Sequence, residues 1–381
     1  MNLCRKGKCK MKWLNSSKKR LVLIGFIMAV ILLGGKRVKA DFVFGEPVNL
    51  GPPINTSSNE ATFCLSADDL EIYISSNRSG TYGIGDIWAS TRPTINDNWT
   101  EPVNLGPVVN SPFPDTVEYI SPDGLELYFD ALNRPGGKGG WDIWVTIRAT
   151  KDDPWGVPTN LGTPFNTSAH DWKACISPDN LTFYFTSMRP GGYGGADIWV
   201  AGRATTEEPW AEPVNLGPLV NSSADDSGQK ISGDGLTLFF HSMRSGGYGA
   251  HDMWMTKRRT TDDDWNDPVN LGPMVNTASD DIMPNISADG SILYFCSPRP
   301  GGRGAWDIYQ APIIPIVDLN GDGFVDTADI CIIVENWGTD NSLCDIGPMP
   351  WGDGVVDVED LIVFMIYWEQ ENMPEEPDGG E

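Results

Sequence analysis

The sequence predicts an all-β domain made of five similar four-stranded units, followed by a small α-helical domain. Three observations predict it. The phrase Asn-Leu-Gly occurs five times between positions 49 and 272, with a period of 55 or 56 residues. Short alternating runs and glycine-rich turns fill each repeat, and no helical period occurs in it. After residue 317 the composition changes to acidic loops followed by apolar residues at helical spacing.

The first 40 residues have the composition of an export signal. They contain eleven Lys and Arg and no acidic residue, and the basic stretch ending at Arg20 leads into the apolar run Leu21 to Leu33. Val38-Lys39-Ala40 offers a small-residue cleavage site. An uncleaved anchor is the alternative, but 13 apolar residues are few for a bilayer. We therefore expect a signal peptide over residues 1–40 and a secreted protein, extracellular or periplasmic, that meets a membrane only during export.

The charge balance excludes nucleic acid as a partner. The chain carries a formal net charge of −25, and loss of the basic signal would leave about −36. Such a chain repels phosphate, whereas nucleic-acid-binding proteins present basic patches. The negative charge favours solubility, and part of it serves the metal ligands described below.

Each repeat has the pattern of four short strands. In the second copy, Tyr119 to Ser121 ends the first strand, and the turn Pro122-Asp123-Gly124 leads into Leu125 to Asp130, where apolar residues alternate. A glycine-rich turn follows Arg134, the third strand covers Asp142 to Ile147, and the fourth lies around Pro158 to Leu161. Four strands per repeat, repeated five times, predict the blades of a β-propeller.

The two ends of the repeat array are complementary. The segment Phe44 to Leu50 matches only the fourth strand of a repeat, with Phe44 where Trp99, Trp155, Trp210 and Trp265 stand elsewhere. The last copy stops after its third strand at Ile308-Tyr309. The N-terminal segment should complete the last blade and close the ring, which removes exposed strand edges. We therefore expect a five-bladed propeller over residues 44–311.

These repeats resemble the WD40-like propeller repeats related to those of TolB-type periplasmic proteins. The resemblance rests on phrases such as Ile176-Ser177-Pro178-Asp179, Leu181 to Phe185, Arg189-Pro190-Gly191-Gly192 and Asp197-Ile198-Trp199. It covers about 270 residues and implies the propeller fold but no particular function, because that family is a scaffold used for binding and sometimes for unrelated tasks.

A calcium-binding loop follows the proline-bounded linker at residues 312–317. Asp318 to Asp329 is a twelve-residue loop with Gly323 at the position of the sharp turn. Oxygen ligands are expected from the side chains of Asp318, Asn320, Asp322, Asp326 and Asp329 and from the carbonyl of Phe324. Ile330, Ile333, Val334 and Trp337 then predict a helix that stops at Gly338.

A second loop and helix follow, and the pair resembles a dockerin. The second loop offers Asp353, Val355, Asp357 and Asp360 and leads into a helix over Leu361 to Trp368. Its first loop positions carry no acidic side chain, so either Asp345 reaches in from an enlarged loop or this site is weak or empty. The resemblance implies a dockerin-like domain over residues 318–370, a calcium cofactor and a cohesin-like partner, with an acidic tail at 371–381.

Two groups of propeller residues are candidates for chemistry. An acidic residue opens the first strand of every blade, at Glu60, Asp115, Asp171, Asp226 and Asp281, which favours a structural role, such as capping a turn or pairing with a repeated arginine, over catalysis. Residues that differ between blades are better candidates for ligand contacts: Phe63, Glu118, His170, Trp172, Lys173, Gln229, Lys230 and Asn285. Their mixture of aromatic faces and hydrogen-bonding groups suits a glycan, and equally suits ordinary variation at strand ends.

Five cysteines follow the signal segment. Cys64, Cys175 and Cys296 are predicted to be small buried side chains of the propeller. Cys331 and Cys344 lie close in sequence, and whether they pair in an oxidising compartment is left open by their spacing.

The leading functional hypothesis is a non-catalytic binding or scaffold-docked propeller, associated with carbohydrate or the cell envelope. The alternative is a glycoside hydrolase, because dockerins commonly accompany such enzymes and five-bladed propellers are a known glycosidase architecture. A third hypothesis is a structural protein of the cell envelope. Glu118 is a candidate general acid, but no partner carboxylate is evident for it. With three histidines and no serine-elbow or zinc motif, other hydrolase chemistries are weakly supported, and no catalytic residue is assigned.

Overall fold

The computed structural model describes residues 42–317 and, further along the chain, residues 319, 325, 327–339, 341, 344–347 and 355–372. The expected signal peptide lies outside the described residues, as does the tail from residue 373. Six expected calcium ligands also lie outside them, namely Asp318, Asn320, Asp322, Phe324, Asp326 and Asp353.

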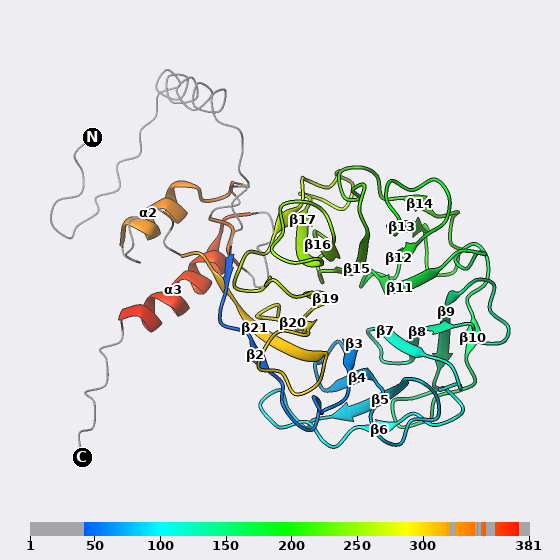
Figure 1. Ribbon diagram of the computed structural model, residues 1–381. Helices are drawn as coiled ribbons and strands as arrows, with labels where there is room; N and C mark the ends of the chain where they lie inside the picture. Colours follow the sequence, from blue (N-terminus) through cyan, green and yellow to red (C-terminus); the bar gives the residue numbers. More distant parts are fainter. Residues whose placement is uncertain are drawn as a thin grey trace, which may run out of the picture. The chain divides into compact units, whose positions relative to one another are not determined.

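Five antiparallel sheets form a ring (Figure 1). Blade 1 contains β3 (Glu60–Leu65), β4 (Glu71–Ser76), β5 (Asp86–Thr91) and β6 (Val103–Asn104). Blade 2 contains β7 (Asp115–Ile120), β8 (Glu126–Leu132), β9 (Trp141–Ile147) and β10 (Thr159–Asn160). Blade 3 contains β11 (Asp171–Ile176), β12 (Thr182–Ser187), β13 (Asp197–Gly202) and β14 (Val214–Asn215). Blade 4 contains β15 (Asp226–Ile231), β16 (Thr237–Ser242), β17 (Asp252–Lys257) and β18 (Val269–Asn270). The inner strands β3, β7, β11 and β15 contact one another in order around the ring.

Blade 5 is built from both ends of the propeller domain. It contains β19 (Ile282–Ile286), β20 (Ile292–Ser297) and β21 (Asp307–Pro315), and its fourth strand is β2 (Val48–Asn49). The five-bladed ring and its closure by the N-terminal segment are therefore confirmed. β1 (Phe42–Phe44) also pairs with the end of β21, with Phe42 opposite Pro315. Residues 312–315, assigned to a linker from their composition, thus belong to the last blade, because β1 supplies a partner strand.

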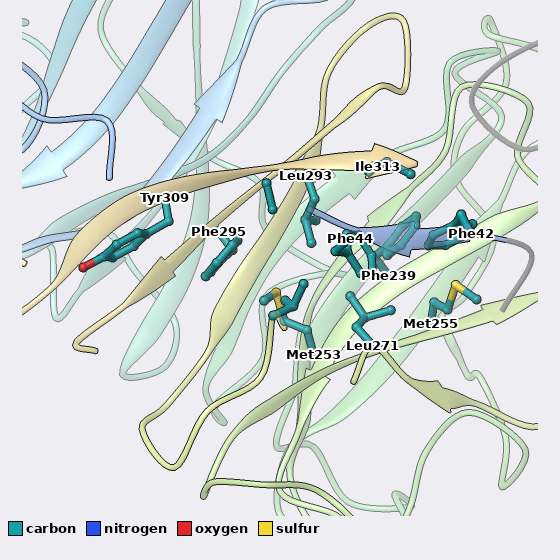
Figure 2. Close-up of a cluster of buried hydrophobic side chains, with 12 residues drawn as sticks. Phe42, Phe44, Phe239, Met253, Met255, Leu271, Leu293, Phe295, Tyr309 and Ile313 are labelled. Carbon is teal, nitrogen blue, oxygen red and sulfur yellow. The ribbon is translucent and has the colours of Figure 1, made fainter. Parts of the chain in front are cut away.

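Apolar side chains fill the spaces between neighbouring blades. The cluster between blades 4 and 5 contains Phe42 and Phe44 from β1, which lie against Phe239 and Leu271 (Figure 2). Val43, between the two phenylalanines, is 50% exposed because alternate side chains of a strand face opposite sides. Burial of each phenylalanine contributes about 1.5–3 kcal/mol, so the N-terminal strand stabilises the closed ring.

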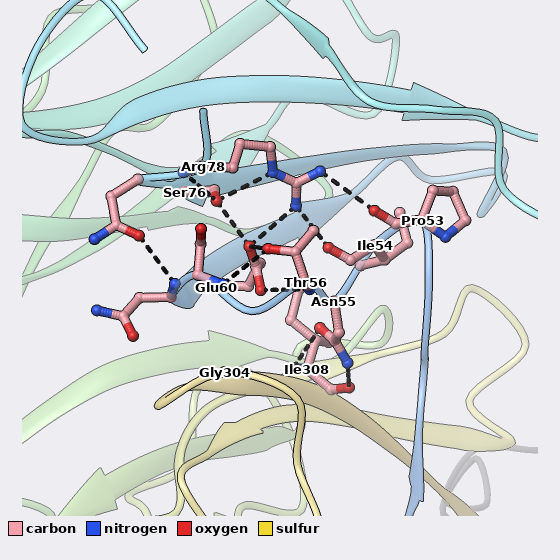
Figure 3. Close-up of polar contacts among 12 residues, drawn as sticks. Pro53, Ile54, Asn55, Thr56, Glu60, Ser76, Arg78, Gly304 and Ile308 are labelled. Carbon is pink, nitrogen blue, oxygen red and sulfur yellow. Dashed lines mark hydrogen bonds and ion pairs between the residues drawn. The ribbon is translucent and has the colours of Figure 1, made fainter. Parts of the chain in front are cut away.

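Buried ion pairs fix the start of each blade. In blade 1, Arg78 Nη2 lies 3.1 Å from Glu60 Oε1, and Ser76 Oγ donates to the same oxygen at 2.7 Å (Figure 3). The equivalent pairs are Arg134–Asp115, Arg189–Asp171, Arg244–Asp226 and Arg299–Asp281. The predicted structural pairing of the repeated acids with the repeated arginines is therefore confirmed.

The described part of the C-terminal segment contains two helices, α2 (Thr327–Glu335) and α3 (Val358–Asn372), as the apolar spacing predicts. Their core includes Ile333, Cys344, Val356 and Phe364. Within the described residues, no helix is long and apolar enough to cross a bilayer.

Candidate functional site

A β-bulge in each inner strand changes the direction of the side chains that follow the opening acid. In blade 3 the pairing of β11 with β12 shifts between Trp172 and Cys175. Lys173 lies within this bulge at a φ of 62°, a conformation that is uncommon for residues other than glycine. Bulges of this kind re-aim side chains and are frequent next to functional sites.

A cavity of about 390 Å³ lies between blades 2 and 3. Blade 2 contributes Thr116 from β7, Asp130 from β8 and Trp141 from β9, and blade 3 contributes His170, Trp172, Lys173 and Met188. Two indole rings and a thioether supply apolar surface, while the other side chains supply hydrogen-bonding groups. The volume suits one small unit of a ligand.

The imidazole of His170 has a fixed orientation. The backbone N–H of Trp141 donates to its Nδ1 at 3.1 Å, so in the neutral ring Nε2 carries the proton. Gly140 makes this packing possible, because a Cβ at that position would lie 2.4 Å from His170 Cε1. The ring also meets Trp172 edge-on, at a centroid distance of 6.0 Å. His170 therefore presents a donor beside an aromatic wall.

Glu118, Asp130 and Lys173 form a buried charged cluster. Lys173 Nζ donates to Glu118 Oε1 at 2.7 Å, and the backbone N–H of Lys173 donates to Asp130 Oδ2 at 2.9 Å. Burial raises the pKa of Glu118, against the attraction of Lys173, and raises the pKa of Asp130 well above its usual value, with the charge of Glu118 adding to the effect. Asp130 Oδ1 is buried and has no hydrogen-bond partner among the described residues.

The other candidate residues lie outside the cavity lining. Gln229 accepts a hydrogen bond from Thr186 Oγ1 at 2.9 Å and donates to the carbonyl of Lys173, so it supports the bulge from blade 4. The ammonium of Lys230 lies 5.1 Å from the ring centroid of Tyr119, which links two blades that are not neighbours. Asn285 and Phe63 are buried, and Phe63 packs in the core between blades 5 and 1.

Reasoning from the sequence named His170, Trp172 and Lys173 but missed Thr116, Asp130, Trp141 and Met188. The strand register makes Asp130 equivalent to Ser75, Thr186, His241 and Cys296 on the second strands of the other blades. Asp130 is the only acid among these five. In addition, Arg134 lies four positions after Asp130, whereas in the other blades the arginine lies three positions after the counterpart of Asp130. In the sequence, Asp130 could have been found as an acidic residue that is followed by a one-residue insertion.

The predicted calcium ligands that the structure describes lie around α2 and α3. Asp329 and Asp360 are fully buried. The N–H of Leu319 donates to Asp329 Oδ1 at 2.9 Å, and the N–H of Ile346 donates to Asp360 Oδ1 at 2.5 Å. Leu319 follows Asp318 and Ile346 follows Asp345, so Asp345 has the place in the second loop that Asp318 has in the first.

This correspondence fits a second loop that begins at Asp345 and is four residues longer than the first. Burial raises the pKa of Asp360, and the charge of Asp357 adds to it, which a bound cation would offset. Among the positions described, no three His, Cys, Asp or Glu side chains converge on one metal position. Val355 and Asp357, the remaining described candidates, precede α3 directly.

No protein-family model matches the sequence, and no curated protein matches it. Solved structures similar to the chain include a putative TolB from Agrobacterium tumefaciens, with 16% identity, a TM-score of 0.40 and coverage of 67% of this chain and 78% of that one. TolB from Acinetobacter baumannii has 14% identity and a TM-score of 0.44, over 79% and 73%. An α-L-arabinofuranosidase from Lactobacillus brevis has 16% identity and a TM-score of 0.46, over 69% and 92%. At these identities the likeness concerns the propeller fold alone.

Proposed function

We propose that the protein is an exported, non-catalytic binding protein whose propeller holds a neutral carbohydrate unit in the cavity between blades 2 and 3. The observation that carries the proposal is the lining of this cavity, where Trp141 and Trp172 stand beside His170 and the Lys173 cluster. Indole rings bind the apolar faces of sugar rings, and fixed polar groups bind their hydroxyls.

A neutral ligand fits the electrostatics better than an anion. The one ammonium in the cavity lining is bound to Glu118 at 2.7 Å, so its charge is already offset. The chain as a whole carries a net charge of −25 and repels anionic ligands. Hydroxyl groups, by contrast, match the donor of His170 and the acceptors of Asp130 and Thr116.

The carboxyl geometry supports binding over hydrolysis. Glycosidases separate their two catalytic carboxyls by about 5–9.5 Å to place them on two sides of the scissile bond. Glu118 and Asp130 instead both accept hydrogen bonds from Lys173, Glu118 from the Nζ at 2.7 Å and Asp130 from the backbone N–H at 2.9 Å. Glu118 is therefore occupied by internal partners and is a poor general acid.

The C-terminal segment is proposed to tether the protein through calcium. Calcium would be held by Asp318, Asn320, Asp322, Asp326, Asp329 and the carbonyl of Phe324, and at the second loop by Asp345, Asp353, Asp357, Asp360 and the carbonyl of Val355. The bound ion would neutralise the loop carboxylates and hold each loop closed against its helix. A cohesin-like domain is the proposed partner, and calcium-dependent retention on immobilised cohesin domains tests it.

A glycan array tests the binding function. We expect the full chain without its signal segment to bind a defined set of neutral glycans. Trp172→Ala should weaken this binding about 30-fold, because it removes one aromatic wall. Ile282→Ala is the matched control, since Ile282 has the same strand position in blade 5. Release of reducing sugar from a bound polysaccharide, abolished by Glu118→Gln, would favour the glycoside hydrolase instead.

A further inference from the structure

Three tyrosines occupy one repeat position at the end of the propeller where the cavity lies. Tyr82, Tyr193 and Tyr248 stand in the loops between the second and third strands of blades 1, 3 and 4, and their exposed fractions are 57%, 51% and 52%. Trp141 and Met188, which line the cavity, stand in or beside the loops of the same kind in blades 2 and 3. The tyrosines and the cavity therefore share one face.

The loops that carry these tyrosines are held rigidly. The N–H of Tyr193 donates to Asp197 Oδ2 at 2.6 Å, and the N–H of Tyr248 donates to Asp252 Oδ1 at 3.0 Å. Each loop also packs closely on the next blade, because a Cβ at Gly194 would lie 1.9 Å from the carbonyl oxygen of Ala224. Exposed aromatic side chains on rigid loops bind with little loss of conformational entropy.

The tyrosines are unevenly distributed around the cavity. Tyr193 lies five residues after Met188 in the loop of blade 3, and Tyr248 occupies the same position in blade 4. On the other side of the cavity, the same repeat position is Lys138 in the loop of blade 2, and its side chain is exposed. Tyr82 stands in the loop of blade 1, one blade further around the ring. On the side of blades 3 and 4, the exposed residues at this repeat position are therefore tyrosines, one in each of two successive blades.

We propose that the ligand is an extended carbohydrate chain, with one unit in the cavity and the following units lying over Tyr193 and then Tyr248. This inference rests on the proposed function, because it takes the cavity as the site of one sugar. The amphipathic phenol rings offer a flat face to sugar rings and a hydroxyl to their polar edges. The chain has a direction, since only one side of the cavity continues into tyrosines.

An array of gluco-, xylo-, arabino- and manno-oligosaccharides of one to six units tests the inference. We expect the affinity of the wild type for the bound sugar to rise with length. Tyr193→Ala should lower the affinity for the longest oligosaccharide about fivefold to tenfold and leave the affinity for the single sugar unit unchanged. Tyr248→Ala should affect only the longer members.

Tyr82→Ala is the matched control, because Tyr82 has a similar exposure and the equivalent backbone hydrogen bond, from its N–H to Asp86 Oδ2 at 2.6 Å. It should bind all lengths like the wild type. An affinity that depends on Trp172 but not on length would overturn the inference and keep the proposed function. Binding of no glycan of any length, or retention of proline-rich peptides in place of glycans, would overturn both.

Discussion

Lys173 holds two carboxyl groups of the neighbouring blade through two different atoms. Its Nζ lies 2.7 Å from Glu118 Oε1, and its backbone N–H lies 2.9 Å from Asp130 Oδ2. The second bond depends on the bulge in β11, where Lys173 has a φ of 62°. One residue therefore joins blade 3 to blade 2 beside the cavity between them.

Replacing Lys173 by methionine should destabilise the propeller. The change leaves Glu118 without its cation in a site where the carboxylate is 2% exposed, and breaking such a buried pair costs about 3–5 kcal/mol. Urea unfolding at pH 7 measures the loss. Lys151→Met is the control, because its pair with Asp68 is 44% exposed on both sides and contributes less than about 1 kcal/mol. Equal losses of stability in the two variants would contradict the stabilising role of the buried pair of Lys173 and Glu118.

The stability of the propeller should fall as the pH rises above the ordinary range of carboxyl groups. The pKa values of Glu118 and Asp130 are raised in the folded state by burial. A raised pKa means that the folded state binds the proton more tightly than the unfolded state. This stabilisation is complete below the unfolded pKa of about 4 and is lost as the pH rises through the folded pKa.

Urea unfolding between pH 4 and pH 9 tests this dependence, with Asp130→Asn as the comparison. The amide cannot ionise, so the variant should lose less stability with rising pH than the wild type. If both proteins had the same pH profile, the raised pKa of Asp130 would not be a cause of the pH dependence.

Truncating Phe44 should open the ring at blade 5. Phe44→Ala removes a buried ring from the cluster between blades 4 and 5 and should cost about 3–5 kcal/mol. Val43→Ala is the matched control in the same strand, since Val43 is half exposed and should change stability by less than about 1 kcal/mol. Thermal unfolding measures the stability of both variants. A loss of stability confined to Val43→Ala would contradict the role of Phe44 in closing the ring.

Removal of calcium should unfold the C-terminal segment and leave the propeller folded. Calorimetry of the full chain in calcium and in EDTA measures the two transitions, and the smaller one should move to lower temperature in EDTA. Asp329→Ala should have the same effect. Asp345→Asn should weaken the second site only, if the second loop begins at that residue. Unchanged melting in EDTA would contradict the calcium assignment.

The propeller could be predicted from the sequence because all five blades repeat one pattern of strands and turns. The missing fourth strand of the last copy predicted that Val48 and Asn49 complete blade 5, and they do. The pairing of β1 with the end of β21 was not predictable, because Phe42 and Val43 have no counterpart in any repeat.

The cavity was predicted only in part, because it depends on a register between two strands. Lys173 and Trp172 differ from their counterparts on the first strands and were found by that difference. Asp130 lies on a second strand, and its contact with Lys173 follows from the bulge in β11, which no sequence pattern marked. In the sequence, the insertion after Asp130 distinguishes this blade from the others at the position of the cavity.

Calorimetric titration of the best glycan from the array into the wild type and Trp172→Ala is the sharpest test of carbohydrate binding in the cavity. We expect saturable binding of one neutral glycan chain per propeller, weakened about 30-fold by the substitution while the melting temperature is kept. Binding of equal strength to both proteins would place the ligand outside the cavity and overturn the proposed function.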